Sequence, residues 1–193
     1  MKVAGCILAG GRSSRFGSDK ALIEWKGRTL LSHAIEGLRS QVDSIVINTN
    51  SEAAEFRAAG LPVVPDQTGS GEGPLAGVLA GLEWAGKIGA SHLATVAVDT
   101  PLFPDNLVAT LGGNAGKKII AAESATGLHP TFALWPVTVT PALASWLSSG
   151  QSRKMTDFLK SQSFDTAMFE KTGPLDPFFN INTPDDLSAL ADL

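Results

Sequence analysis

A short loop near the start of the chain collects glycines and cations in a pattern suited to phosphate. It reads LAGGRSSRFGSDK from Leu8 to Lys20 and follows an apolar run, Val3 to Leu8, that predicts a buried strand. Its glycines let the backbone come close to a bulky ligand, and it carries three cations, Arg12, Arg15 and Lys20. Backbone N–H groups and fixed cations together can surround anionic oxygens. We therefore expect the loop to bind a di- or triphosphate.

One carboxylate is placed to complement this basic loop. Asp99 directly follows an apolar run, His92 to Val98, that also predicts a strand. A carboxylate there can hold a divalent cation against phosphate oxygens, although it could instead only cap the turn that follows. The basic loop at the same predicted edge favours the metal-binding interpretation. Among the cations of the loop we expect Lys20 to be essential, with Arg15 next.

The elements that must position these side chains alternate between strand and helix. Hydrophobic spacing and capping residues define them. The alternation predicts a single-domain, three-layer α/β nucleotide-binding fold with a mostly parallel, mixed sheet. The predicted strands are Val3–Leu8, Ser44–Asn48, Pro62–Pro65, His92–Val98, Lys118–Ala122 and Pro130–Trp135, with extended pieces at Leu22–Trp25 and Phe178–Ile181. The predicted helices are Thr29–Ser40, Glu52–Ala59 with Ser51 as its cap, Leu75–Ala85, Asp105–Leu111, Pro141–Leu147, Lys154–Ser161 and a last one capped by Thr183.

Polar residues follow several of these strands at their carboxyl ends. Asn48 ends the second strand, Asp66 follows the third and Asp99 follows the fourth. In open α/β sheets, ligands bind beyond the carboxyl ends of the strands. We therefore expect these side chains to share one edge of the sheet with the basic loop.

Two later features are candidate contacts for a second substrate. His129 precedes Pro130, where the chain enters a strand, and could face that substrate or be structural. Asn180 and Asn182 are two residues apart, so strand alternation points both to one side. They could serve a metal or a phosphate, or they could only form turn hydrogen bonds before the last helix.

A second Gly-rich stretch, Gly69 to Gly77, could lie along a nucleobase or ribose, or it could be an ordinary loop before a helix. The segment Gly81 to Lys87 imitates the start of a P-loop. However, Ile88 stands where a Ser or Thr should bind magnesium, and the segment fits a helix end. We therefore reject a P-loop at this position.

Composition limits the classes of function. The 193 residues are 44% hydrophobic and carry a net charge of −4, which predicts a folded protein and argues against nucleic-acid or anionic-membrane partners. The one cysteine, Cys6, allows no internal disulfide, as is typical of a reducing cytoplasm. The first residues lack the length of a membrane span and the organisation of a signal peptide. We expect a cytoplasmic protein of one domain, residues 1–193.

Several motifs taken together resemble a known family. The segments are LAGGRSSRFGSDKAL, Asn48, PDQTGSGEGPLAG, VAVDTPLFP, HPTFALW and FFNINTPDDL. In this order they resemble bacterial molybdenum cofactor guanylyltransferases of the MobA type, and the similarity spans nearly the full length. The resemblance implies transfer of GMP from Mg-GTP to the terminal phosphate of molybdopterin, or of its molybdenum-loaded form, with release of pyrophosphate. It also implies Mg²⁺ as cofactor, and molybdoenzymes or cofactor-delivery proteins as candidate partners.

The same resemblance implies residue roles. The expected catalytic residues are Arg15, Lys20 and Asp99, and Asp99 is also the expected magnesium ligand. The expected contacts for pterin or phosphate are His129, Asn180 and Asn182. The expected nucleotide-binding positions are Leu8, Ala9, Gly10, Gly11, Lys20, Asn48, Asp66 and Asp99.

Two other classes of function, one enzymatic and one not, remain open from the sequence. Related cytidylyltransferases usually read LAAG where this chain reads LAGG, which favours guanine, but a cytidylyltransferase or a sugar-phosphate nucleotidyltransferase would use a similar first loop. A GTP-binding module that delivers cofactor without catalysis is the non-enzymatic alternative. The sequence contains no convincing Ser–His–Asp or Cys–His set, which agrees with a phosphate nucleophile that needs no general base.

Overall fold

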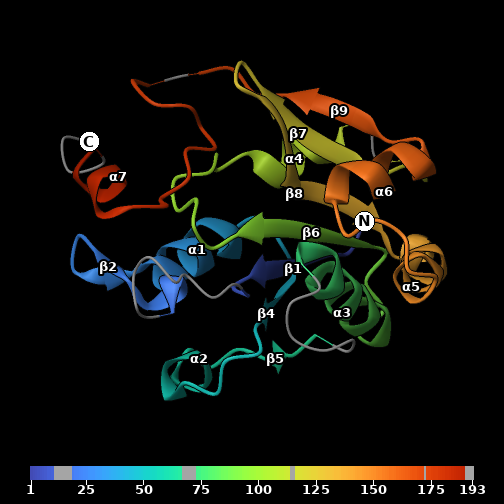
Figure 1. Ribbon diagram of the computed structural model, residues 1–193, viewed down its shortest axis with the longest axis horizontal. Helices are drawn as coiled ribbons and strands as arrows, with labels where there is room; N and C mark the ends of the chain where they lie inside the picture. The colour runs from blue at the N-terminus through green and yellow to red at the C-terminus, as the bar shows by residue number, and fades with distance from the viewer. Residues whose placement is uncertain (11–18, 67–72, 114–115, 172, 190–193) are drawn as a thin grey trace.

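The apolar segments of the chain form a seven-stranded sheet with helices on both faces (Figure 1). The computed structural model describes residues 1–10, 19–66, 73–113, 116–171 and 173–189. The strands of the sheet are β1 (Val3–Leu8), β4 (Ser44–Asn48), β5 (Val63–Val64), β6 (His92–Ala97), β7 (Ile120–Ser124), β8 (Gly127–Pro136) and β9 (Asp165–Met168). A separate hairpin consists of β2 (Glu24–Trp25) and β3 (Arg28–Thr29). The helices are α1 (Leu30–Arg39), α2 (Ala54–Ala58), α3 (Pro74–Lys87), α4 (Leu107–Gly112), α5 (Thr140–Ser148), α6 (Met155–Gln162) and α7 (Pro184–Ala189), with 3₁₀ turns η1 (Lys20–Leu22) and η2 (Val137–Val139).

The sheet is mostly parallel, as the alternation of elements predicts. Its order is β5-β4-β1-β6-β8-β7-β9, which runs from bottom to top in Figure 1. Strand β8 is antiparallel to both of its neighbours, whereas the other pairings are parallel. The reversal follows from the short turn between β7 and β8, since two strands joined by a tight turn must run in opposite directions. The sheet is therefore mixed.

Alternation along the buried strands divides the core into two layers. In β1, Val3 and Ile7 pack with one cluster of apolar side chains, which includes those of α1 and α4. Ala4, Cys6 and Leu8 pack with the other cluster, which includes those of α3, α5 and α6. Because both faces of the sheet are covered, polar groups from the strands are accessible mainly where the strands end. This arrangement confirms the three-layer α/β fold.

Several element boundaries differ from the sequence expectations. Helix α2 begins at Ala54 rather than Glu52, and its cap residue is Ala53 rather than Ser51. Strand β9 was not expected, because an edge strand with one buried side chain in four shows little periodicity. The extended piece predicted at Phe178–Ile181 is not a strand, although Ile181 N–H donates to the Asp99 carbonyl at 2.8 Å.

A bulge in β8 makes room for this later segment. The pairing of β7 with β8 jumps from Ala121–Ala133 to Ala122–His129, so residues 130–132 of β8 are bulged out of the ladder. Strand β6 pairs with β8 only as far as Thr95–Ala133. The carboxyl end of β6 is therefore free to hydrogen-bond to the segment that precedes α7. This places Ile181 and its neighbours beside the end of β6.

Candidate active site

The candidate site centres on an ammonium and a carboxylate from distant parts of the chain. Lys20 Nζ lies 2.8 Å from Asp99 Oδ2 and 2.8 Å from Asn182 Oδ1. The Lys20 side chain is 14% exposed and that of Asp99 is 25% exposed, so both groups are fixed yet reachable by a ligand. Lys20 begins η1, and Asp99 lies two residues beyond the end of β6. The structure thus joins the two charged residues that the sequence singled out.

The segment before α7 is fastened beside this pair. Asn180 Oδ1 accepts a hydrogen bond from Thr100 Oγ1, and Asn182 contacts Lys20 directly. Thr183 Oγ1 accepts from the Asp186 N–H at 3.3 Å, which confirms the predicted cap. Asp186 in turn accepts from the Asn182 N–H, and this hydrogen bond lowers the pKa of its carboxyl group. Both asparagines therefore lie at the site, Asn180 bonded to Thr100 and Asn182 to Lys20.

A second polar group lies at the ends of β4 and β5. Asn48 is 3% exposed, and its Nδ2 donates to Asp66 Oδ1 at 2.9 Å and to the Val64 carbonyl at 3.2 Å. Asn50 Nδ2 donates to Asp66 Oδ2 at 2.8 Å. Burial and the nearby Asp66 charge raise the pKa of the Cys6 thiol to about 12, so this cysteine is an unreactive core residue. The described contacts make Asn48 a residue that orients Asp66.

The first positions of the basic loop offer backbone rather than side chains. Leu8 and Ala9 are 7% and 3% exposed, and the Ala9 N–H donates to the Asn48 carbonyl at 2.9 Å. Gly10 is exposed at the end of β1. Any ligand at these positions would meet mainly peptide groups. The predicted Gly11 and Arg15 lie outside the described residues.

Helix α3 approaches the same corner very closely. A Cβ atom at Gly77 would lie 2.1 Å from Asn48 Oδ1, so no larger residue fits there without displacing the asparagine. Gly77 thus permits close helix–strand packing, and residues 69–72 of the Gly-rich stretch lie outside the described residues. The segment Gly81–Lys87 is continuous helix, which agrees with the rejection of a P-loop.

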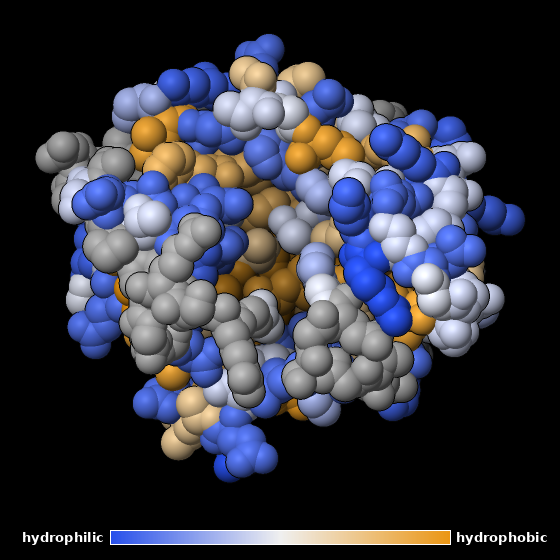
Figure 2. Space-filling model, viewed as in Figure 1, coloured by the Kyte–Doolittle hydropathy of each residue, from blue (hydrophilic) through white to orange (hydrophobic). Residues whose placement is uncertain are grey.

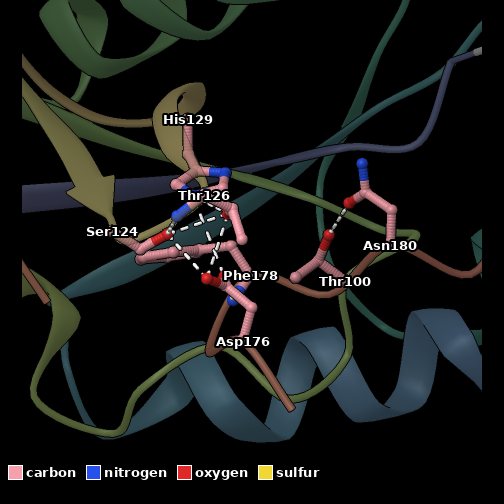
Figure 3. A network of polar contacts seen from close by, with 7 residues as sticks. All are labelled: Thr100, Ser124, Thr126, His129, Asp176, Phe178 and Asn180. Atoms are coloured by element: carbon pink, nitrogen blue, oxygen red, sulfur yellow. Dashed lines mark hydrogen bonds and ion pairs between the residues drawn. The ribbon is translucent and has the colours of Figure 1, made fainter. Parts of the chain in front are cut away.

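His129 belongs to a hydrogen-bonded cluster at the β7–β8 turn (Figure 3). Its Nε2 lies 2.7 Å from Ser124 Oγ, and Ser124 Oγ lies 2.7 Å from Asp176 Oδ2. Thr126 Oγ1 donates to the same Asp176 oxygen at 3.0 Å. The His129 ring also packs on Phe178, with centroids 4.5 Å apart. His129 therefore lies near the start of β8, with one ring nitrogen already engaged.

This cluster was not expected from the sequence, and its connectivity differs from a nucleophilic triad. The carboxylate bonds to the serine rather than to the histidine, and Ser124 is only 4% exposed. A buried serine whose proton is held by an aspartate is not an activated nucleophile. One local signal could have pointed to Asp176. It precedes Pro177 and accepts the Phe178 N–H at 2.8 Å, as an aspartate does when it opens a turn.

The surface of the molecule also carries a hollow and an acidic groove. Figure 2 shows a central hollow lined by apolar residues, with mostly hydrophilic residues around it. A groove of about 910 Å³ lies between α1, the segment before α4 and residues 168–177, and it includes four carboxylates, Glu36, Asp105, Glu170 and Asp176. Such a lining repels phosphate. Lys20 and Asp99 do not line this groove.

The comparison with known proteins identifies the family. Residues 5–166 match the model of the MobA-like NTP transferase domain. The molybdenum cofactor guanylyltransferase of Rhizobium meliloti (strain 1021) is 46% identical over 189 residues, covering 94% of this chain and 87% of that protein. The chain belongs to the MobA-like NTP transferase family. The guanylyltransferase of Cereibacter sphaeroides is 40% identical over 189 residues, covering 97% of this chain and 95% of the relative.

Solved structures agree with this family assignment at the level of the fold. The molybdopterin-guanine dinucleotide biosynthesis protein A of Archaeoglobus fulgidus superposes with a TM-score of 0.76 at 23% identity, covering 100% of this chain and 97% of that one. A 2-C-methyl-D-erythritol 4-phosphate cytidylyltransferase of Thermus thermophilus gives 0.70 at 18% identity, covering 100% of both chains. The family match and the guanylyltransferase relatives identify the chain as an enzyme of the nucleotidyltransferase class. Among the described helices, none is long and apolar enough to cross a membrane.

Proposed function

We propose that this enzyme transfers GMP from Mg-GTP to the terminal phosphate of molybdopterin and releases pyrophosphate. The observation that carries the proposal is the Lys20–Asp99 pair, which lies at the carboxyl ends of β1 and β6 in a chain whose relatives are named molybdenum cofactor guanylyltransferases. The product is molybdopterin guanine dinucleotide. The proposal treats residues 1–193 as one nucleotidyltransferase domain that works in the cytoplasm, and its product would pass to molybdoenzymes or delivery proteins.

The nucleotide would lie across the ends of β1, β4 and β6. The peptide groups of Leu8, Ala9 and Gly10 would lie along it, because the side chains there are buried or missing. Asp66, held by Asn48, would accept hydrogen bonds from the nucleoside. Gly11 and Arg15 are proposed to join from the same loop.

The charged pair would act on the phosphates. Lys20 is held at 2.8 Å by Asp99 and by Asn182, so its ammonium is positioned before a ligand arrives. A positioned cation stabilises the charge that develops on a pyrophosphate leaving group. Asn180 fixes Thr100 and so steadies the turn that carries Asp99.

The residues of the site suit a magnesium ion that arrives bound to the nucleotide phosphates. Magnesium is usually held by one or two protein carboxylates, with phosphates and waters filling the remaining positions. Among the described residues no group of three or more metal-ligating side chains occurs, whereas Asp99 offers one accessible carboxylate. Bound there with GTP, magnesium would neutralise phosphate charge. A second role for Asp99 would follow, because the same carboxylate now holds Lys20.

The proposed reaction needs no general base. The nucleophile is a phosphate monoester whose second pKa is near ~6, so it is largely ionised at neutral pH. Its oxygen attacks the α-phosphorus of GTP, a new P–O bond forms, and the bond to pyrophosphate breaks. Catalysis then depends on positioning and charge neutralisation. The buried, aspartate-bound Ser124 is consistent with this mechanism, since the chain would form no covalent intermediate through it.

Measurement of pyrophosphate release tests the proposal and its competitors. The purified chain is given GTP, CTP, ATP or UTP with magnesium, and either molybdopterin or a sugar phosphate as acceptor. We expect turnover with GTP and molybdopterin only. Turnover with CTP, or with a sugar phosphate, would show one of the alternative transferases. Tight GTP binding without pyrophosphate release would show a delivery module.

The residue assignments have their own test within the same assay. Asp99→Ala should lower the turnover number by about 10²–10³, because it removes a preorganised charge at the phosphates. Asp165→Ala is the matched control, since this exposed aspartate lies in the edge strand β9 and, among the described residues, forms its ion pair with Lys118. Equal activity of both variants would refute the role of Asp99.

A further inference from the structure

The cluster around His129 is a directed chain of hydrogen bonds. It runs from the Asp176 carboxylate through the Ser124 hydroxyl to His129 Nε2, with 2.7 Å at each step. Thr126 contacts two members of the chain: its N–H donates to Ser124 Oγ at 3.2 Å, and its hydroxyl donates to Asp176 Oδ2 at 3.0 Å. The side chains of His129 and Asp176 are 18% and 13% exposed. His129 and Asp176 are thus largely but not fully buried, whereas Thr126 is exposed.

The chemistry of these groups settles where the protons lie. An ionised carboxylate only accepts hydrogen bonds, so the proton between Asp176 and Ser124 belongs to the serine. Hydrogen bonds, led by those from Ser124 and the Phe178 N–H, lower the pKa of Asp176 even though partial burial opposes them. Because the hydroxyl hydrogen of Ser124 points to the aspartate, Ser124 Oγ can only accept a hydrogen bond from His129. The imidazole therefore carries its hydrogen on Nε2.

The other ring nitrogen is then an acceptor with a fixed direction. No described residue is hydrogen-bonded to His129 Nδ1. In Figure 3 this nitrogen is turned away from Ser124, toward the side where Thr100 and Asn180 lie. Packing on Phe178 at 4.5 Å holds the plane of the ring. The lone pair of Nδ1 is thus aimed along the same sheet edge that carries Asp99.

We propose that His129 Nδ1 recognises a ring N–H donor of the pterin, and that Ser124 and Asp176 are positioning residues that keep this nitrogen in its accepting form. The inference rests on the proposed function, which supplies a pterin as acceptor substrate. It separates two ligands that the sequence left open for His129. A phosphate dianion has only acceptor oxygens and would meet a lone pair at Nδ1, whereas a pterin ring and its amino group carry N–H donors.

The charge on His129 is consistent with this role. Burial lowers the pKa of the imidazole, and the nearby Asp176 carboxylate, 3.8 Å away, only partly opposes the shift. Asp176 is the charged group paired with His129 among the described residues, and the other neighbours are the hydroxyls of Ser124 and Thr126 and the ring of Phe178. The neutral form therefore prevails at neutral pH.

Two substitutions of His129 separate recognition from structural support. In His129→Asn the amide overlaps the position of Nδ1 and can present an oxygen there, but it cannot reach Ser124. In His129→Gln the amide reaches the position of Nε2 and can keep the bond to Ser124, but nothing replaces Nδ1. We expect His129→Gln to raise the KM for molybdopterin about threefold to tenfold, which is the value of one neutral hydrogen bond. We expect His129→Asn to stay within about twofold of the parent, with the GTP KM unchanged in both.

Thermal unfolding should rank the two variants in the opposite order. His129→Asn breaks the link to Ser124 and should melt at the lower temperature, whereas His129→Gln should melt near the parent. If His129 were only structural, the less stable variant would also be the less active one. A lower molybdopterin KM for His129→Gln than for His129→Asn would overturn the proposal.

The positioning residues are tested by a spectroscopic readout. Nitrogen-15 NMR of the full chain should show His129 as the Nε2–H tautomer at neutral pH. Ser124→Ala should let the two tautomers mix and raise the molybdopterin KM, while Ser148→Ala, which removes an exposed hydroxyl from α5, should change neither. An Nδ1–H tautomer in the parent protein would refute the inference. If the parent makes no dinucleotide at all, the proposed function fails instead, and the tautomer measurement still stands.

Discussion

The close approach of α3 to β4 gives the sharpest stability prediction. Gly77→Ala would place a Cβ atom 2.1 Å from Asn48 Oδ1 and 3.0 Å from Leu8 Cδ2. Overpacking of this kind costs about 1–3 kcal/mol, and a displaced Asn48 would leave buried amide groups unpaired at a further cost of about 1–3 kcal/mol. Against these stands a gain of about 1 kcal/mol from alanine in a helix. We expect a net loss of about 3 kcal/mol, taking the middle of each range.

The same helix offers a matched control. A Cβ atom at Gly86 would make only an ordinary contact, 3.4 Å from Val137 Cγ1. Gly86→Ala should therefore gain up to about 1 kcal/mol from helix propensity alone. In thermal unfolding, Gly77→Ala should melt about 6–12 °C below the parent, and Gly86→Ala at or above it.

The clash itself can be isolated by a double-mutant cycle. Asn48→Ala removes the atoms that the new Cβ would strike, so the double variant should lose less stability than the sum of the single variants. Simple additivity, or equal melting of Gly77→Ala and Gly86→Ala, would refute the view that this glycine exists to admit Asn48.

The remaining predictions concern charge, pH and the core. Lys20→Ala should lower turnover by about 10²–10³ in the pyrophosphate assay while the melting temperature stays near that of the parent; near-normal turnover would remove Lys20 from the mechanism. Because burial lowers the pKa of His129 below its ordinary 6.5, the unfolded chain binds more protons as the pH falls through that value. Urea titrations across that range should therefore show that the free energy of unfolding decreases as the pH decreases. His129→Gln should make this free energy depend less on pH; an unchanged dependence would exclude His129 as its source. Thr95→Val should cost about 1–3 kcal/mol with little change in activity, since Trp135 Nε1 donates to this buried hydroxyl at 2.9 Å; an unchanged unfolding free energy would contradict that reasoning.

Much of the fold could be predicted from local patterns. The bounds of β1 and β4 match their predicted ranges, because a buried strand in a parallel sheet is a short, continuous apolar run. Helix α1 starts where Thr29 accepts the Ser32 N–H at 3.1 Å, as its capping position indicates. Strand β9 was missed, since it lies at the edge with mostly exposed side chains. Local patterns fail where few side chains are buried.

For the candidate site, too, some features could be predicted from the sequence and others could not. Strand ends place Asn48, Asp66 and Asp99 on one edge, so their shared location was predictable from topology alone. What topology does not report is that Asn48 is buried and donates a hydrogen bond to Asp66. That arrangement depends on how closely α3 packs, which no local pattern reports.

The sequence by itself determined the class of fold, the edge of the sheet where the candidate site lies and the types of groups that gather there. These properties depend on periodicity and on strand ends, which are written in neighbouring residues. Tertiary structure alone decided which groups meet: Lys20 joins Asp99 across 79 residues and Asn182 across 162, and Ser124 joins Asp176 across 52. A hydroxyl or a carboxylate has no period that marks its partner, so only the packed sheet and the bulge in β8 bring such distant groups within hydrogen-bond distance.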